Sequence, residues 1–237
     1  MLEVRDARAV IDGHEVLRGV TVRVGDGESV ALVGPNGSGK TTLLRAVAGL
    51  VRLSSGRVLI DGSDVTSTPV KVRASMGVAL VPNEGEVFPD LTVLENLIVA
   101  GSALRDASEL ARNVERAFSA FGRLRERSRV KASALSGGER RMLAIAMGLV
   151  RSPRVLLLDE PSSGLSPAAL RDVASVLRSF RGPRTSVLVA EQNLDAALAL
   201  AERVYVVKGG AVVAEALSSE REALARAFAS SHWVTRS

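Results

Sequence analysis

The chain has 237 residues, of which 46% are apolar and 24% are charged, so it is long enough for one large α/β domain with an inserted segment. It contains no cysteine, which excludes disulfides and thiolate metal sites. The net charge is +5, but basic residues are scattered among acidic ones and aromatic residues make up only 3%, which argues against a nucleic-acid-binding protein.

The N-terminal residues lack the apolar core of a signal peptide, and no stretch approaches the ~18 uncharged apolar residues of a membrane span. We therefore expect a cytoplasmic protein, and any peripheral association with the inner face of the membrane is expected to go through partner subunits. Apolar and polar residues alternate over the first 28 positions, notably at Val20, Val22 and Val24, and Val58–Ile60 reads as a further short strand. These patterns predict an antiparallel sheet beside the core.

A phosphate-binding loop, Gly34–Thr41, follows the apolar run Ser29–Val33 and fits G-x-x-x-x-G-K-[ST]. Its glycines let backbone N–H groups turn inward around phosphate oxygens, and the helix that follows points its N-terminus at the anion. Lys40 is expected to reach the β and γ phosphates and Thr41 to bind Mg²⁺ through its hydroxyl. The predicted nucleotide-binding residues are Gly34, Pro35, Asn36, Gly37, Ser38, Gly39, Lys40, Thr41 and Thr42.

A helical pattern extends from about residue 92 to residue 131, and Thr92–Glu95 matches a capping box. A second S-x-x-E pattern, Ser136–Glu139, opens another helix. Two glycines at a capped helix start expose N–H groups that can bind a phosphate, although the sequence alone does not place them beside their own phosphate loop. After the second helix, Val155–Leu158 reads as a strand buried on both faces that ends in two carboxylates.

The two carboxylates are Asp159 and Glu160, and they lie at the strand end where open α/β sheets bind ligands. We expect Asp159 to hold Mg²⁺ through water and Glu160 to orient or deprotonate the attacking water. Farther on, Val204–Val207 and Ala211–Ala214 predict a hairpin.

The phosphate loop, the string Leu135–Glu139 and the Asp159–Glu160 strand together resemble the ATP-binding cassette family over nearly the whole chain. The resemblance implies an α/β fold with a P-loop NTPase (RecA-like) core, an N-terminal antiparallel β subdomain and an inserted α-helical subdomain. The implied boundaries are about 1–85 and 152–214 for the core with the β subdomain, 86–151 for the helical subdomain, and 215–237 for a C-terminal tail.

The same resemblance implies that the ligands are ATP and Mg²⁺ and that ATP is hydrolysed. In the family, two cassettes form a head-to-tail dimer in which the signature string of one subunit closes on the ATP held by the other. We call Leu135–Glu139 the signature string. The residues expected to make this contact across the dimer are Ser136, Gly137, Gly138 and Glu139.

Four positions depart from the family pattern. Gln192 stands where a His usually contacts the γ phosphate; with Glu160 it is a predicted catalytic residue, but it cannot become cationic. Asn83 stands where a Gln usually links the nucleotide site to the helical segment, and it is a candidate to hold a metal-bound water. Ile11 replaces the aromatic residue that stacks on adenine, which should weaken base selectivity. Ser166 stands where Asp is common.

Two strings, Glu86–Leu97 and Glu191–Asn193, are similar to one branch of the family, the second ATP-binding subunit of transporters for branched-chain amino acids, amides or urea. That branch implies an importer, transmembrane permease subunits, and an extracellular substrate-binding protein that acts indirectly. It implies a partner ATP-binding subunit that keeps the His, so a heterodimer is favoured over a homodimer. Val87–Pro89 is expected at the edge of a groove for a short permease helix.

Two other functions compete with a transporter subunit. A cassette ATPase that acts on nucleic acid typically has long coiled coils, zinc-binding cysteines or two cassettes, none of which this sequence contains. A small P-loop kinase would not explain the signature string. We therefore expect no nucleic-acid partner, whereas the transported molecule and the direction of transport are not determined by these residues.

Overall fold

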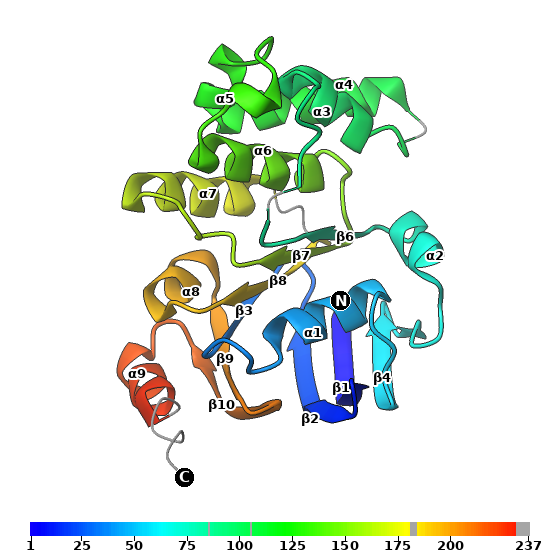
Figure 1. Ribbon diagram of the computed structural model, residues 1–237, viewed down its shortest axis with the longest axis vertical. Coiled ribbons are helices and arrows are strands. Elements are labelled where there is room, and N and C mark those ends of the chain that lie inside the picture. The colour runs from blue at the N-terminus through cyan, green and yellow to red at the C-terminus, as the bar shows by residue number, and fades with distance from the viewer. Residues whose placement is uncertain (85, 105, 181–183, 231–237) are drawn as a thin grey trace.

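The computed structural model describes residues 1–84, 86–104, 106–180 and 184–230. Gly85, at the end of the first predicted core segment, and residues 231–237 of the predicted tail lie outside the described residues. Figure 1 shows an antiparallel sheet at one end of the molecule, a second sheet across the middle and a group of helices at the opposite end. Among the described residues, no helix combines the length and apolarity needed to cross a bilayer.

The first sheet is antiparallel, as the alternating N-terminal residues predict. Its strands are in the order β2-β1-β4-β5, and β1 pairs with both β2 and β4. The strands are β1 (Leu2–Ile11), β2 (His14–Val24), β4 (Ser55–Ile60) and β5 (Ser63–Asp64).

The second sheet is mixed and carries the site. Its order is β10-β9-β3-β8-β7-β6, and every neighbouring pair is parallel except β9 and β10, which form the predicted hairpin. Parallel strands buried on both faces explain the continuous apolar runs in the sequence. The strands are β3 (Ser29–Val33), β6 (Val78–Val81), β7 (Val155–Asp159), β8 (Ser186–Glu191), β9 (Arg203–Lys208) and β10 (Ala211–Leu217).

Two apolar cores share this second sheet. On one face, Val30, Leu32 and Leu157 pack with α1 and the antiparallel sheet. On the other face, Ala31 and Leu158 pack with α7, α8 and the helical segment, which includes α6 (Gly137–Leu149). The alternation follows from the period of two along a strand. The helices packed around the sheets are α1 (Lys40–Ala48), α2 (Val70–Ser75), α7 (Pro167–Phe180), α8 (Leu194–Leu200) and α9 (Arg221–Ser230).

The helical segment lies between β6 and β7 in the chain and forms the upper part of Figure 1. Both predicted capping boxes are present: Thr92 and Glu95 begin α3, and Ser136 and Glu139 begin α6. Each box satisfies N–H groups that a helix start otherwise leaves unpaired. The helices of this segment are α3 (Val93–Ala100), α4 (Ala107–Ala120), α5 (Gly122–Glu126), the 3₁₀ helix Ala132–Ala134 and α6 (Gly137–Leu149).

Candidate active site

The phosphate loop connects β3 to α1 and encloses a cavity of about 110 Å³ that is lined by Asn36 to Thr42, Val16 and Glu160. Gly37 and Gly39 have φ values of +77° and +102°, a region that side chains rarely adopt. A Cβ on Gly39 would also lie only 3.0 Å from the carbonyl oxygen of Val16. Two of the motif's glycines are therefore required by the backbone path itself.

Lys40 and Ser38 offer polar groups to this loop. The Lys40 Nζ is buried and donates hydrogen bonds to the carbonyl oxygens of Gly34 at 2.8 Å and Pro35 at 3.0 Å. Burial lowers the pKa of Lys40, while the carboxylates of Glu160, Asp159 and Glu191 oppose that shift. The buried Oγ of Ser38 has no hydrogen-bond partner among the described residues. A buried ammonium and an unpaired hydroxyl in a glycine-rich loop at a helix start fit a phosphate ligand.

Thr41 and Asp159 bring together the two groups predicted to hold the metal. Thr41 Oγ1 donates to Asp159 Oδ1 at 3.0 Å, across 118 residues of sequence. Burial raises the pKa of Asp159, and the hydrogen bond from Thr41 acts in the opposite direction. A hydroxyl beside a carboxylate provides the oxygen ligands that Mg²⁺ takes, so these residues fit the ion.

Glu160 follows directly, in an uncommon backbone conformation. Its φ is +47°, in the left-handed region, and its N–H donates to the Ala190 carbonyl of β8 at 2.8 Å. Positive φ in a non-glycine residue persists where the surroundings fix it, and such residues gather at functional sites. Glu160 Oε2 accepts a hydrogen bond from Asn83 Nδ2 at 3.2 Å. The structure thus places Asn83 beside the predicted water-orienting carboxylate; its role toward the metal stays a prediction.

The end of β8 contributes a carboxylate that the sequence analysis did not assign. Glu191 is only 2% exposed and accepts hydrogen bonds from the N–H and Oγ of Ser162, both at 2.9 Å. Burial raises the pKa of Glu191. It immediately precedes Gln192, whose side chain is exposed. Glu191 therefore ties the loop after Glu160 to the residue predicted to contact the γ phosphate.

The remaining predicted positions lie around this centre. Ile11 is exposed at the end of β1 and does not line the phosphate-loop cavity, whereas Val16, which the sequence analysis did not single out, does. The Oγ of Ser166 accepts a hydrogen bond from Ala169 N–H at 3.2 Å, in the first turn of α7. Ser166 thus caps a helix in this structure.

Within the signature string, Ser136 and Gly137 are exposed at the start of α6, Gly138 and Glu139 are half-buried, and Leu135 is buried. A Cβ on Gly137 would meet nothing within 4 Å, so this helix start is open to a ligand. The helix packs on the face of the central sheet opposite to α1, which carries the phosphate loop's lysine. The two helix starts that are predicted to bind phosphate therefore belong to helices on opposite faces of one sheet.

Sequence reasoning missed Arg141. It lies on α6, is only 6% exposed, and donates hydrogen bonds to the carbonyl oxygen of Pro82 at 2.9 Å and to Asn83 Oδ1 at 2.8 Å. A signal was present, because Arg141 falls four residues before Ile145 and eight before Leu149, on the apolar stripe of the helix. A charged residue on such a stripe needs a buried partner.

The geometry agrees with comparisons to known proteins. The family model "ABC transporter" matches residues 17–163. The chain belongs to the ABC transporter family. A probable branched-chain amino acid transport ATP-binding protein of Archaeoglobus fulgidus is 40% identical over 80% of both chains. A high-affinity branched-chain amino acid transport ATP-binding protein of Pseudomonas aeruginosa is 37% identical over 84% of this chain and 85% of its own.

Another relative has a different transport function. The lipopolysaccharide export system ATP-binding protein of Haemophilus influenzae is 36% identical over 85% of this ABC transporter chain and 84% of its own. Among solved structures, the ADP conformation of an ATP-binding cassette of an ABC transporter superposes with a TM-score of 0.83 over 99% of both chains at 24% identity, which shows the fold. The α/β cassette fold expected from the motifs is confirmed, and the chain is an ATP-hydrolysing subunit of a transporter.

Proposed function

We propose that this ABC transporter subunit powers an importer of branched-chain amino acids or related amides or urea. The observation that carries its ATPase chemistry is the meeting of Thr41 with Asp159 beside Glu160 and the phosphate loop. The two branched-chain amino acid relatives and the strings Glu86–Leu97 and Glu191–Asn193 support the import assignment. The lipopolysaccharide export relative is almost as similar, so export is the second candidate.

In the proposed reaction, the phosphate loop and Lys40 bind the triphosphate. Thr41 and Asp159 would hold Mg²⁺, which would supply positive charge to neutralise the phosphates. Glu160 orients the attacking water and accepts its proton. Gln192 donates a hydrogen bond to the γ phosphate, and Ser136–Glu139 contact the nucleotide of the partner subunit. Ile11 lies near the base, and Asn83 stays a candidate for a metal-bound water.

The groove for the permease lies between the core and the helical segment. It is a cavity of about 640 Å³ whose lining includes the apolar residues Val87, Phe88, Val99 and Met147 together with Glu86 and Arg151. Phe88 is 47% exposed and Val99 is 42% exposed, so apolar surface is available to a partner. A short permease helix that buries this surface supports the proposed peripheral position at the inner face of the membrane.

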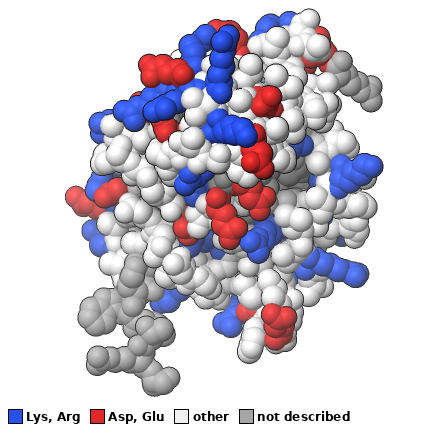
Figure 2. All heavy atoms as spheres, turned by 45° about the horizontal axis from the view of Figure 1, so that its top comes forward, with Lys and Arg blue, Asp and Glu red and all other residues white. Residues whose placement is uncertain are grey.

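The surface charge favours this assignment over an ATPase that acts on nucleic acid. In the view of Figure 2, acidic side chains gather near the middle of the face and basic ones are interspersed above and around them. Several arginines of the helical segment are paired, including Arg112 with Asp106 and Arg125 with Glu115. A nucleic-acid groove would need a continuous basic stripe.

Uptake and partner capture test the transport assignment. Reconstituted with the permease that co-purifies with it, the chain should drive ATP-dependent uptake of labelled leucine, acetamide or urea into vesicles. Transfer of lipopolysaccharide without uptake of these solutes would replace the import assignment by an export assignment.

The variant Glu160→Gln tests the catalytic role of Glu160. It should keep ATP binding and trap an ATP-bound dimer, and an undiminished hydrolysis rate in that variant would remove Glu160 from the mechanism.

Gln192 tests the proposed heterodimer. If a partner subunit with a His supplies the stronger site, hydrolysis by the isolated chain should be weak and should rise when the partner is added. Robust turnover by the chain alone that is insensitive to Gln192→Ala would instead support a homodimer with two equivalent sites.

A further inference from the structure

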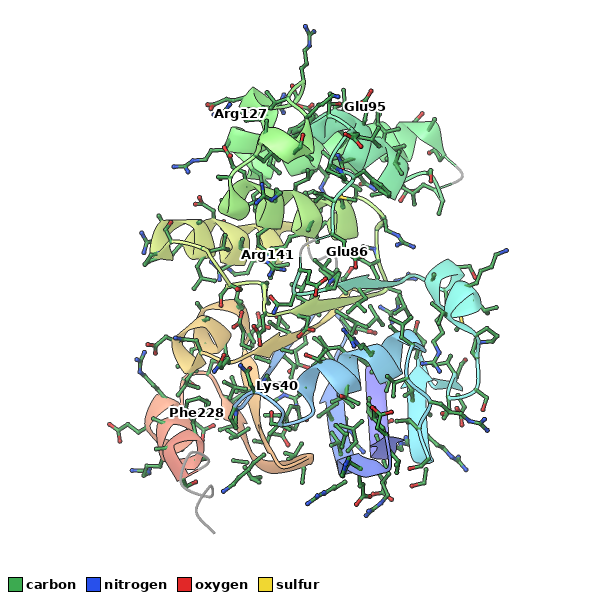
Figure 3. All side chains as sticks on the ribbon, viewed as in Figure 1. Lys40, Glu86, Glu95, Arg127, Arg141 and Phe228 are labelled. Atoms are coloured by element: carbon green, nitrogen blue, oxygen red, sulfur yellow. The ribbon has the colours of Figure 1, made fainter. Side chains whose placement is uncertain are left out.

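Arg141 connects α6, the helix that begins within the signature string, to the predicted site of ATP hydrolysis. Its Nη1 donates to the carbonyl oxygen of Pro82 at 2.9 Å, and its Nη2 donates to the backbone and side-chain oxygens of Asn83. Figure 3 shows Arg141 extending from α6 toward the central sheet, with Lys40 at the start of α1 on the sheet's other side. The Arg141 guanidinium thus hydrogen-bonds to both the backbone and the side chain of Asn83.

Asn83 in turn has a defined orientation. Because Oδ1 accepts from Arg141, Nδ2 is the atom that faces Glu160 Oε2, at 3.2 Å. A carboxylate can only accept, so the amide must present its donor to Glu160 and its acceptor to Arg141. The two hydrogen bonds therefore require each other, and turning the amide over would break both.

The charges around Arg141 explain why a buried guanidinium is tolerated. Burial lowers the pKa of Arg141, and the carboxylates of Glu191, Asp159 and Glu160 oppose that shift. Lys40 experiences the same three carboxylates from the phosphate loop. Because Gln192 cannot carry a positive charge, Arg141 supplies a fixed cation from the helical segment to a site crowded with acidic groups.

We propose that Arg141 is a positioning residue for hydrolysis, which acts through Asn83 to fix the carboxylate of Glu160 against the attacking water. The inference rests on the proposed role of Glu160. Arg141 lies in the first turns of the same helix that begins with the signature string, and a helix moves as a rigid element. If the start of α6 moves when it contacts the nucleotide of the partner subunit, Arg141 moves with it and shifts Asn83 and Glu160 in this chain's own site.

The simplest alternative is that Arg141 only closes off the backbone carbonyls of residues 82 and 83. The two roles differ in what they change. A structural clamp affects stability and nucleotide binding along with the rate, whereas a positioning residue lowers kcat and leaves the affinity for ATP unchanged.

The experiment measures kcat, KM and the ATP dissociation constant for Arg141→Met, Asn83→Ala and the double variant, with the full chain and any partner subunit that co-purifies. Loss of a hydrogen bond to a charged group predicts a fall in kcat of about tenfold for each single variant, with the ATP dissociation constant changed less than about twofold. Because the residues act in series, the double variant should be no slower than the slower single variant. Multiplying effects would overturn the proposal.

Three further variants keep the result interpretable. Arg112→Met is the matched control, because it removes an exposed guanidinium of the same segment and should leave kcat unchanged. Arg141→Lys keeps the charge without the fork of donors and should recover only part of the rate. Asn83→Asp keeps an acceptor for Arg141 but has no donor for Glu160, and its position is exposed, so it tests the second hydrogen bond even if Arg141→Met does not fold.

Two outcomes separate this inference from the proposed function. If Glu160→Gln abolishes hydrolysis while Arg141→Met and Asn83→Asp retain the normal kcat, the inference fails and the role of Glu160 stands. If Glu160→Gln itself hydrolyses ATP normally, the proposed mechanism fails before Arg141 is at issue. A lowered melting temperature together with weaker ATP binding in Arg141→Met, with Asn83→Asp unaffected, would assign Arg141 to the structural clamp.

Discussion

Asn96→Ala should loosen the loop that borders the permease groove. The Asn96 side chain is fully buried; it accepts a hydrogen bond from Phe88 N–H at 2.7 Å and donates to the carbonyls of Phe88, Leu91 and Thr92 at 3.0, 3.2 and 2.9 Å. It thus fixes the turn that carries Phe88 to the start of α3. The Asn96 side chain therefore hydrogen-bonds to residues at both ends of this turn, Phe88 and Thr92.

The magnitude follows from what each partner retains after truncation. The Leu91 carbonyl still accepts from Ala132 N–H, the Thr92 carbonyl still accepts from the backbone of residue 96, and the Phe88 carbonyl still accepts from Leu91 N–H. The Phe88 N–H alone loses its described partner. One unsatisfied donor costs about 1–3 kcal/mol, and partial access of water to Phe88 favours the middle of that range, so we expect a loss of about 2 kcal/mol.

Urea denaturation of the parent, Asn96→Ala and Leu94→Ala measures this loss. Leu94 is an exposed neighbour on the same helix and should change the free energy of unfolding by less than about 0.5 kcal/mol. In the assembled transporter, Asn96→Ala should also reduce stimulation of ATP hydrolysis by the permease more than it reduces basal hydrolysis. A change for Asn96→Ala no larger than that for Leu94→Ala would refute the hydrogen-bond argument.

Three other measurements test the site. Lys40→Ala should abolish tight ATP binding, because it removes the ammonium of the phosphate loop, and titration with a fluorescent ATP analogue would detect the loss. Burial raises the pKa of Asp159, so Mg²⁺ binding should weaken on acidification at a higher pH than for an exposed Asp, as metal titration across pH with Asp159→Asn as reference would show. Burial also raises the folded-state pKa of Glu191 above its ordinary value of 4.5. As the pH rises past that value, Glu191 therefore loses its proton first in the unfolded chain. The parent should therefore lose stability relative to Glu191→Gln on going from acid to neutral pH, and equal pH dependence of the two in denaturation experiments would contradict the assignment.

Much of the cassette was predictable because its signals are local. The phosphate loop, both capping boxes and the strand ending in Asp159 are each contained within a few consecutive residues, and each has a physical requirement that the residue types reveal. The parallel sheet followed from apolar runs such as Ser29–Val33. A feature whose physical requirement is met by a few consecutive residues can therefore be located from the sequence alone.

The connections between segments were not predictable in the same way. Asn83 was recognised only by its position, yet its partners Arg141 and Glu160 come from two other elements, and only the fold brings the three together. Such a contact is visible in the sequence only as a charged residue at a position expected to be buried. Arg141 interrupts the apolar stripe of α6, and Glu191 ends the apolar strand β8. A charged residue at such a position indicates that it has a buried polar partner, but the order of residues in the chain does not identify that partner.

Strand order explains why these contacts converge. β8 enters the sheet late in the chain but lies between β3 and β7, so its last residue, Glu191, comes to lie between the phosphate loop and the Asp159–Glu160 pair. Three carboxylates therefore gather at one edge, and the charge of Lys40 alone does not balance them. The guanidinium of Arg141, buried on α6, adds positive charge close to these carboxylates. If Arg141 positions Asn83 and Glu160 as we propose, the rate of hydrolysis also depends on the position of α6.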